Sequence, residues 1–148
     1  MNCLSLWQPW GSFLVWDIKG PETRSWPCPP HLIGQPLAIH AAKIQVSALT
    51  MTDSKHDELV MNAYELWNEL DGEPMVYGAV LGIVKVVACY RTEDLGYLFE
   101  VTDLQRALGN YAPGRYAWVC EVVERFNPPI PAKGMQGIWK WNPPVGDR

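Results

Sequence analysis

Two long strand-like segments constrain the fold of this chain more than any other feature of its sequence. Residues 78–90, GAVLGIVKVVACY, form an apolar and β-branched run that is typical of a buried strand. Residues 115–126 alternate between two faces, as the residues of a strand do. Gly82 inside the first segment predicts a bulge or the close approach of another backbone. We therefore expect these two segments to be the core strands of a sheet.

Shorter elements are expected around the core strands. Alternation of apolar residues predicts further strand-like pieces at residues 4–6, 21–26, 36–43 and 138–141. Apolar periodicity and helix breakers predict helices at residues 9–17 and 53–70. Thr102 and Gln105 form a capping box for a short third helix that ends at Gly109. The proline-rich residues 127–131 are expected to cross the surface, and residues 143–148 to form a short tail.

The order of these elements predicts the fold class. The chain has several short strands, few and separated helices, and no regular alternation of strand and helix. Such an order favours an α+β domain built around a small mixed β-barrel with flanking helices. A length of 148 residues is that of one domain, so we expect residues 1–148 to form a single domain.

Composition argues against several classes of protein. No segment reaches the roughly 18 consecutive apolar residues that a membrane helix needs, so we expect a cytoplasmic protein without a membrane partner. The four cysteines contain no C-x-x-C pair and predict no disulfide. Cys28 and His31 have the spacing of half a zinc site, but no second pair matches them, so we expect neither a metal nor a cofactor.

The charge of the chain limits how it can contact nucleic acid. A formal net charge of −4 argues against a protein that coats DNA by bulk electrostatic attraction, so any contact must be local. Acidic residues concentrate between positions 53 and 73, whereas Lys19, Arg24 and Lys43 lie in the first third of the chain. We expect the amino-terminal part to face anions. The acidic helix 53–70 is a candidate surface for a protein partner.

Three charged residues follow the first expected helix and straddle a glycine-proline turn. Glu22 and Arg24 are two residues apart, so in an extended chain they share one face, and Lys19 can fold back toward them. Spacing alone leaves two interpretations open, a salt-bridge group that fixes the turn and a functional cluster. Trp26 follows Arg24 closely and offers an aromatic surface on which a base can stack.

Several motifs resemble those of the ASCH domains, a family named for activating signal cointegrator homology and related to the PUA-like barrels. The opening LSLWQPWGSFLVWDIKGPETRSWP is similar to the family's Gln-Pro-Trp segment and to the signature G-x-K-x-x-E-x-R that follows it. PLAIHAAK is similar to the family's next strand, and GRYAWVCEVVERFNPPIPAKGMQGIWKW to its closing strand and tail. Lys19, Glu22 and Arg24 match the signature, but Asp17 stands in place of its leading glycine. We expect this carboxylate to alter the turn or the charge of the cleft.

The resemblance implies a barrel with helices beside it and a cleft lined by the signature residues. Family members are associated with RNA metabolism, some as binding modules and some as small enzymes acting on RNA or on acylated nucleosides. A lysine in such a cleft binds phosphate or, where burial disfavours its charge, acts as a base or nucleophile. Glu22 would hold Lys19 charged and oriented or relay a proton, and the planar fork of Arg24 suits a phosphate or a base edge.

One mechanism of the family does not carry over to this sequence. In the nucleoside-amide hydrolases of the family, the signature lysine works with a hydroxyl three residues later and with a carboxylate from a later strand. Here Glu22 takes the position of the hydroxyl, and residues 82–90 contain Lys85 but no acid. Binding of RNA or a nucleotide is therefore the expected function. The alternative is a small hydrolase, either a metal-independent ribonuclease or a nucleoside amidohydrolase.

Further residues are candidates for the same site. His40 is a candidate general acid or base beside Lys19 and Glu22, because an unperturbed histidine titrates near neutrality, although a lone strand histidine is often structural. The resemblance implies that His40 and Lys43 lie at the edge of the cleft. The candidate binding residues are Arg24, Trp26, Lys43, Tyr116, Gln136 and Trp139, of which the aromatic ones are equally suited to a core.

Overall fold

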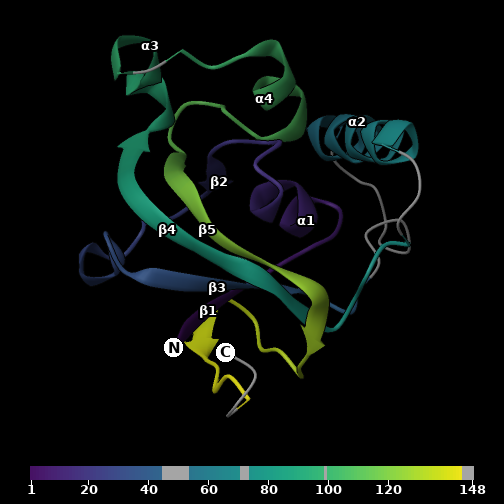
Figure 1. Ribbon diagram of the computed structural model, residues 1–148. Coiled ribbons are helices and arrows are strands. Elements are labelled where there is room, and N and C mark those ends of the chain that lie inside the picture. Colours follow the sequence, from purple (N-terminus) through teal and green to yellow (C-terminus); the bar gives the residue numbers. More distant parts are fainter. Residues whose placement is uncertain (45–53, 71–73, 99, 145–148) are drawn as a thin grey trace.

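The sheet of the protein is built around its two longest strands. The computed structural model describes residues 1–44, 54–70, 74–98 and 100–144. Strands β4 (Ala79–Arg91) and β5 (Tyr116–Pro131) pair in antiparallel fashion and curve across the molecule (Figure 1). Both core strands expected from the sequence are confirmed, with ends that differ from the expected ones.

Four short strands complete a six-stranded mixed sheet. They are β1 (Asn2–Leu6), β2 (Glu22–Arg24), β3 (Pro36–Ala41) and β6 (Ile138–Lys140). The strand order is β2-β5-β4-β3-β1-β6, in which β1 and β3 are parallel and every other neighbouring pair is antiparallel. The sheet curls into a half-barrel (Figure 1), which confirms the expected α+β class with a small mixed barrel.

Gly82 lies where the backbone of β5 comes close to β4. A Cβ atom at this position would lie 2.4 Å from the carbonyl oxygen of Glu124 and 3.3 Å from the Cα of Arg125. The register of the two strands also shifts between Val80 and Gly82. The close approach of another backbone and the irregular pairing that are expected at Gly82 are therefore both present.

Residues 127–131 lie at the surface, as expected, with Asn127, Pro128 and Pro131 exposed, but they continue a strand and do not form a separate loop. They belong to β5, in which Ile130 pairs with Val80. The neighbouring pair is Gly82 with Arg125, so Pro128 and Pro129 fall within a shift of the register, whereas Pro131 pairs with Ala79 at the end of the strand. Proline lacks the N–H that a regular ladder requires, and an interrupted ladder removes that conflict.

Helices pack against the inner side of the sheet and against one another. They are α1 (Trp10–Val15), α2 (Ser54–Leu70), α3 (Leu95–Leu98) and α4 (Asp103–Leu108), and Figure 1 shows α1 within the curl of the sheet. The capping box expected at Thr102 is confirmed, with hydrogen bonds of 3.1 and 3.0 Å between Thr102 and Gln105. Helix α3 and the 3-10 turns at Pro30–Leu32 and Thr92–Asp94 were not expected from the sequence.

Helix α1 is shorter than the helix that the sequence predicts at residues 9–17. It ends at Val15, and Asp17 takes a left-handed backbone conformation with a φ of 58°. The N–H groups of Ile18 and Lys19 both donate to the carbonyl oxygen of Phe13, at 2.8 and 3.2 Å. This turn ends the helix and brings the chain to the start of β2.

Helix α2 packs through an apolar stripe, which the helical periodicity of the sequence predicts at Leu59, Ala63, Leu66, Trp67 and Leu70. Ala63 is fully buried, and the ring of Trp67 stacks on that of Trp16 with 5.1 Å between the centroids. Asn62 Nδ2 donates to the carbonyl oxygen of Ala107 at 2.9 Å, which ties α2 to the end of α4. Packing of one amphipathic face is the usual source of stability for such a helix.

The predicted end of the buried stripe of α2 differs from the observed one, and other predicted ends lie outside the described residues. Leu70 is 42% exposed, so the buried stripe ends one turn earlier than predicted. The predicted helix start at Asp53, its exit at Gly72 and residues 145–148 of the predicted tail lie outside the described residues. Among the described residues, every helix is too short or too polar to cross a membrane.

The main core cluster lies between α1 and the sheet. It combines buried apolar side chains of α1, β1, β3, β4 and β5. Trp118 of β5 has no exposed surface, and its indole N–H donates to the backbone oxygen of Trp26 at 3.2 Å. Burial of apolar surface is the main stabilising contribution in such a core. The core therefore fixes the segment that follows β2, next to the charged residues.

Candidate functional site

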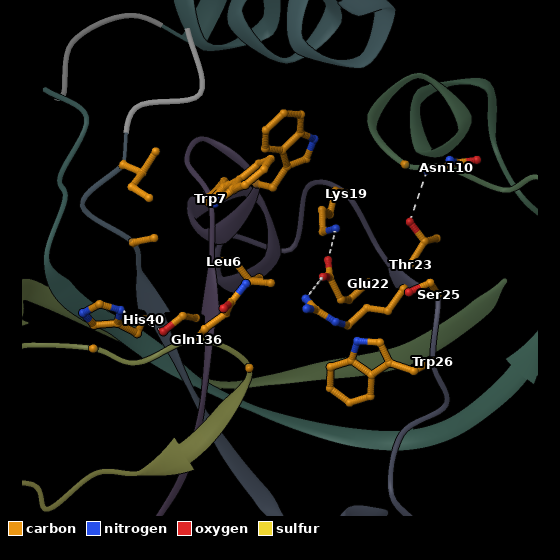
Figure 2. Close-up of a pocket in the computed structure, with 18 of the residues that line it drawn as sticks. Leu6, Trp7, Lys19, Glu22, Thr23, Ser25, Trp26, His40, Asn110 and Gln136 are labelled. Atoms are coloured by element: carbon orange, nitrogen blue, oxygen red, sulfur yellow. Dashed lines mark hydrogen bonds and ion pairs between the residues drawn. The ribbon is translucent and has the colours of Figure 1, made fainter. Parts of the chain in front are cut away.

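A cavity of about 750 Å³ lies between the two ends of the curled sheet (Figure 2). One wall comes from the edge strand β2 and the residues beside it, and another from the ends of β1 and β3. Residues 133–137, which precede the second edge strand β6, continue the latter wall. Trp10 of α1, Leu59 of α2, and Leu108 at the end of α4 with the two residues after it also line the cavity. The volume is within the range of sites that take small organic ligands.

The three charged residues expected to converge do so in the wall of this cavity. The ammonium of Lys19 forms an ion pair with Glu22 Oε1, and Arg24 Nη1 lies 3.1 Å from Glu22 Oε2 (Figure 2). Lys19 is only 3% exposed and Glu22 only 5%. Each carboxylate oxygen of Glu22 thus holds one cation, and little water reaches the pair of Lys19 and Glu22.

Local structure explains why the cluster forms. Gly20, with a φ of 73°, follows the turn at the end of α1 and allows the chain to enter β2. Glu22 pairs with Trp118 and Arg24 with Tyr116 in the antiparallel ladder between β2 and β5. Because residues two apart in a strand share a face, Glu22 and Arg24 point the same way, and Lys19 reaches them from the turn.

Trp26 holds the guanidinium of Arg24 from the side opposite to Glu22. The carbon Cζ of Arg24 lies 4.8 Å from the centroid of the Trp26 ring. Trp26 in turn packs edge-on against Trp118, with 4.9 Å between centroids. A cation over an indole face is attracted by the electron density of the ring. Arg24 is therefore fixed by a carboxylate and by an aromatic ring that the core supports.

The charges that line the cavity differ from those of the whole chain. Within the described part of the chain, Glu22 is the one carboxylate that lines the cavity, and the lining cations are Lys19, Arg24, Lys43, Arg115 and Lys133. The whole chain has 12 lysines and arginines against 16 aspartates and glutamates. The cavity is therefore a local cationic surface on a chain of net negative charge, and this arrangement favours an anionic ligand.

Arg115 lies behind the cluster and was not expected from the sequence. Its Nε donates to the carbonyl oxygen of Asn110 at 3.1 Å. Burial lowers the pKa of its guanidinium, Glu22 acts in the opposite direction, and Arg24 adds a further lowering. An arginine stays charged under such influences, so Arg115 remains a cation in the wall.

His40 lines the cavity but is 2% exposed, and both of its ring nitrogens have partners. Nε2 lies 2.8 Å from the carbonyl oxygen of Ala132, which only accepts, so Nε2 carries a proton. Nδ1 lies 3.2 Å from Ser5 Oγ, which accepts the indole N–H of Trp139 at 2.9 Å and lies 2.7 Å from the carbonyl oxygen of Met135. The single proton of the Ser5 hydroxyl thus has two acceptors when His40 is neutral.

The surroundings of His40 favour its neutral form. Burial lowers the pKa of the imidazole, the hydrogen bond to Ala132 opposes this effect, and Lys43 lowers it further. Gly134 packs directly on the ring, where a Cβ atom would lie 2.2 Å from Cε1. These contacts make His40 a support for the wall formed by residues 133–137.

The remaining candidates from the sequence divide into two groups. Gln136 and Lys43 line the cavity together with Trp26. Tyr116 packs against the main core cluster and Trp139 against a second cluster, where its ring meets His40 edge-on at 5.5 Å. Neither Tyr116 nor Trp139 is among the lining residues, because their rings are used in packing.

Asp17 affects the turn and not the charge of the cavity. The residue is exposed and does not line the cavity. Its φ of 58° lies in the left-handed region, which glycine adopts freely and aspartate tolerates better than most residues. The leading glycine of the signature thus corresponds to a backbone requirement of this turn.

Two further lining residues, Trp7 and Lys133, were not singled out from the sequence. Trp7 follows β1 and is 41% exposed, and Lys133 follows β5 and is exposed. The available signal was that each lies next to a motif already quoted, Trp7 before Gln-Pro-Trp and Lys133 before QGIW.

The described part of the chain contains no cluster of potential metal ligands. Within the described ranges, no group of three or more histidines, cysteines, aspartates or glutamates has the geometry to hold a metal ion. The Cys28 thiol is buried, and burial together with nearby Cys89 raises its pKa to about 11. A protonated thiol is a poor metal ligand.

The chain is similar to Activating signal cointegrator 1 of Homo sapiens and of Mus musculus, with 28% identity over 142 residues in each case. The similar region covers 93% of this chain and 22% of the length of those proteins. The chain thus spans less than a quarter of the relatives that it matches. No family model matches the chain.

The fold and the cavity define the class of the protein. A curled mixed sheet with a helix inside the curl is the architecture of a small α+β barrel domain of the PUA-like type. Within that class, the similarity to the cointegrator over nearly the whole chain agrees with the resemblance of the sequence motifs to ASCH domains, the family named for activating signal cointegrator homology.

Proposed function

We propose that the protein binds a nucleotide or a short piece of RNA in this cavity. The observation that carries the proposal is the cationic lining around Arg24, whose guanidinium is held between Glu22 and the Trp26 ring. Phosphates require cations, and unpaired bases require flat surfaces on which to stack. The cavity supplies both in one place.

Arg24 is the residue best suited to contact a base. Its guanidinium is planar, and Glu22 and Trp26 fix its orientation before any ligand arrives. A guanidinium whose orientation is fixed in advance offers a planar surface on which a base can stack.

The charge of Lys19 suggests that it binds phosphate, but its surroundings favour a different role. Its ammonium is buried and already paired with Glu22, so it is poorly placed to bind a phosphate in addition. Lys19 therefore acts as a positioning residue that holds Glu22 oriented toward Arg24. Binding of phosphate falls to the exposed cations of the lining, Lys43 and Lys133.

The test compares Arg24→Ala with Arg24→Lys in binding of short, labelled, single-stranded RNA measured by fluorescence anisotropy. Loss of a stacking and donor residue is expected to weaken binding about tenfold or more, and lysine, which cannot stack in the same way, is expected to restore little. Lys140→Ala is the matched control, since Lys140 is exposed on β6 and does not line the cavity. Equal affinity of wild type and Arg24→Ala would remove the proposal.

Hydrolysis of RNA or of an acylated nucleoside is the second candidate function. The contact between Lys19 and Glu22 within the cavity favours it, because such a pair can move a proton. His40 adds less to this candidate, since its ring nitrogens are engaged by Ser5 and Ala132. The test incubates the protein with labelled RNA and acylated nucleosides in the presence of EDTA. Turnover no faster than that of Lys19→Ala would exclude it.

A protein partner on α2 is a separate proposal that the sequence motivates. Glu65 and Glu69 of α2 are exposed and acidic, whereas Leu59 of the same helix lines the cavity. A partner with a basic surface would suit that acidic side. Charge reversal, Glu65→Lys with Glu69→Lys, is expected to abolish such an interaction and to leave RNA affinity unchanged or slightly higher.

A further inference from the structure

We infer that the cavity binds two consecutive nucleotides of a single RNA strand, one base on Arg24 and Trp26 and the next base on Trp7. This inference rests on the proposed function and names the form of its ligand. The inference specifies an RNA strand and not a free nucleotide as the ligand. The proposed function leaves that choice open.

Three tryptophans line the cavity, of which Trp10 packs against the cluster of Phe13, Ala63 and Leu108. Trp26 supports Arg24 beside β2, and Trp7 lies at the end of β1 with 41% of its surface exposed. Figure 2 shows these two residues on different sides of the ion pair of Lys19 and Glu22. A single base cannot cover both surfaces. Successive bases of a strand can each take one, as they do on the aromatic platforms of proteins that bind single strands.

The parallel pairing of β1 and β3 places a cation beside Trp7. Leu6 pairs with Ala41 at the carboxyl ends of the two strands, and the N–H of Ala42 donates to the carbonyl oxygen of Leu6 at 2.9 Å. Trp7 and Lys43 therefore leave the sheet at the same place. Both line the cavity, and Lys43 is exposed.

Lys133 lies in the same region, although it belongs to the segment that follows β5. The N–H of Ala132 donates to the carbonyl oxygen of Gly78 at 3.1 Å. The side chain of Lys43 runs over Gly78, where a Cβ atom would lie 3.1 Å from Lys43 Cε. Lys43 and Lys133 are thus brought together on the side of Trp7, away from the carboxylate of Glu22. The phosphodiester that joins two nucleotides needs such a pair of cations.

The experiment measures the affinity of the full chain for two sets of ligands by calorimetry. One set is the nucleoside 5′-monophosphates of the four RNA bases, and the other is the dinucleotides of the same bases. Wild type is expected to bind at least one dinucleotide about tenfold or more tightly than its monophosphates, since each stacked base contributes a gain of that order. Trp7→Ala is expected to remove that gain. Trp7→Phe, which keeps a ring, is expected to retain most of it.

Each outcome decides a different question. Equal affinity of wild type for monophosphates and dinucleotides overturns this inference while the proposed function stands. No binding of either set by wild type overturns both. A Trp7→Ala variant that keeps the dinucleotide gain also overturns the inference. Thermal unfolding of each variant checks that it folds, and Leu98→Ala, at a position 53% exposed outside the cavity, is the matched control.

Discussion

Glu22 holds the ammonium of Lys19 in a contact where the side chains of the two residues are only 7% and 4% exposed. Burying charged groups is costly, and the mutual attraction of the pair offsets that cost only while both partners are present. The same carboxylate also binds Arg24 at 3.1 Å. One residue therefore supports both the stability of the turn and the geometry of the cavity wall.

Replacing Glu22 alone is expected to destabilise the protein by about 3 kcal/mol, because it leaves the ammonium of Lys19 buried without a counter-charge. The measurement is the free energy of unfolding of Glu22→Ala in denaturant. The double variant Lys19→Met with Glu22→Leu removes both charges and is expected to recover most of the loss. If the single variant is as stable as wild type, the pair is solvated and the cavity wall is not as rigid as described.

Replacing Asp17 by glycine is expected to stabilise the protein by up to about 1 kcal/mol, because glycine adopts a left-handed backbone without steric cost. Asp17→Val is expected to have the opposite effect, since a β-branched residue is strained at a φ of 58°. Thermal unfolding measures both. Affinity for RNA is expected to stay unchanged, because Asp17 does not line the cavity.

The control for this prediction is Asp94→Gly. Asp94 is also exposed, but it lies in a right-handed 3-10 turn. Glycine at position 94 is expected to lower the free energy of unfolding slightly, because it adds conformational freedom to the unfolded chain without relieving strain in the folded one. Stabilisation by both exchanges would show that the left-handed conformation of Asp17 is not the cause.

The elements that sequence predicted well depend on contacts between near neighbours. The capping box of Thr102 and Gln105 and the convergence of Lys19 with Glu22 each follow from a few adjacent residues. The close approach at Gly82 joins distant strands, but a glycine within a strand pattern marks it locally. Periodicity also gave the two core strands, because burial on a sheet imposes it.

The parts that sequence did not predict depend on how distant segments meet. Trp7 and Lys133 share a cavity wall because β1 pairs with β3 and because the chain after β5 returns beside Gly78. Neither relationship can be recognised from the spacing of nearby residues in the sequence. The continuation of β5 through residues 127–131 was missed for a related reason, since the shift of register that tolerates proline is set by the partner strand.

His40 is expected to make stability depend on pH. Its pKa in the folded protein is lowered below 6.5, chiefly by burial. The unfolded chain therefore takes up a proton first on acidification, so the contribution is complete above 6.5 and is lost as the pH falls toward the folded value. His40→Gln, which does not titrate, is expected to show a smaller loss of unfolding free energy over that range.

Lys43 is expected to contribute to the lowered pKa of His40 through repulsion of like charges. Titration of the imidazole by nuclear magnetic resonance is the measurement. Lys43→Met is expected to raise the pKa of His40, whereas Lys140→Met, on β6 and outside the cavity lining, is expected to leave it in place. An equal response to both variants would mean that Lys43 is not close to the ring in solution.

The salt dependence of RNA binding distinguishes the residues that contact phosphate from the residue that contacts a base. Each phosphate contact of a single strand contributes about 0.7 to the slope of log affinity against log salt concentration. Lys43→Ala and Lys133→Ala are each expected to reduce the slope by about that amount, and Lys140→Ala to leave it unchanged. Arg24→Ala is expected to lower affinity with little change of slope, because its charge is already paired with Glu22 and its role is to stack. A loss of about 0.7 in slope with Arg24→Ala and none with the two lysine variants would instead assign the phosphate to the buried cluster, and the exposed lysines would then lie outside the bound strand.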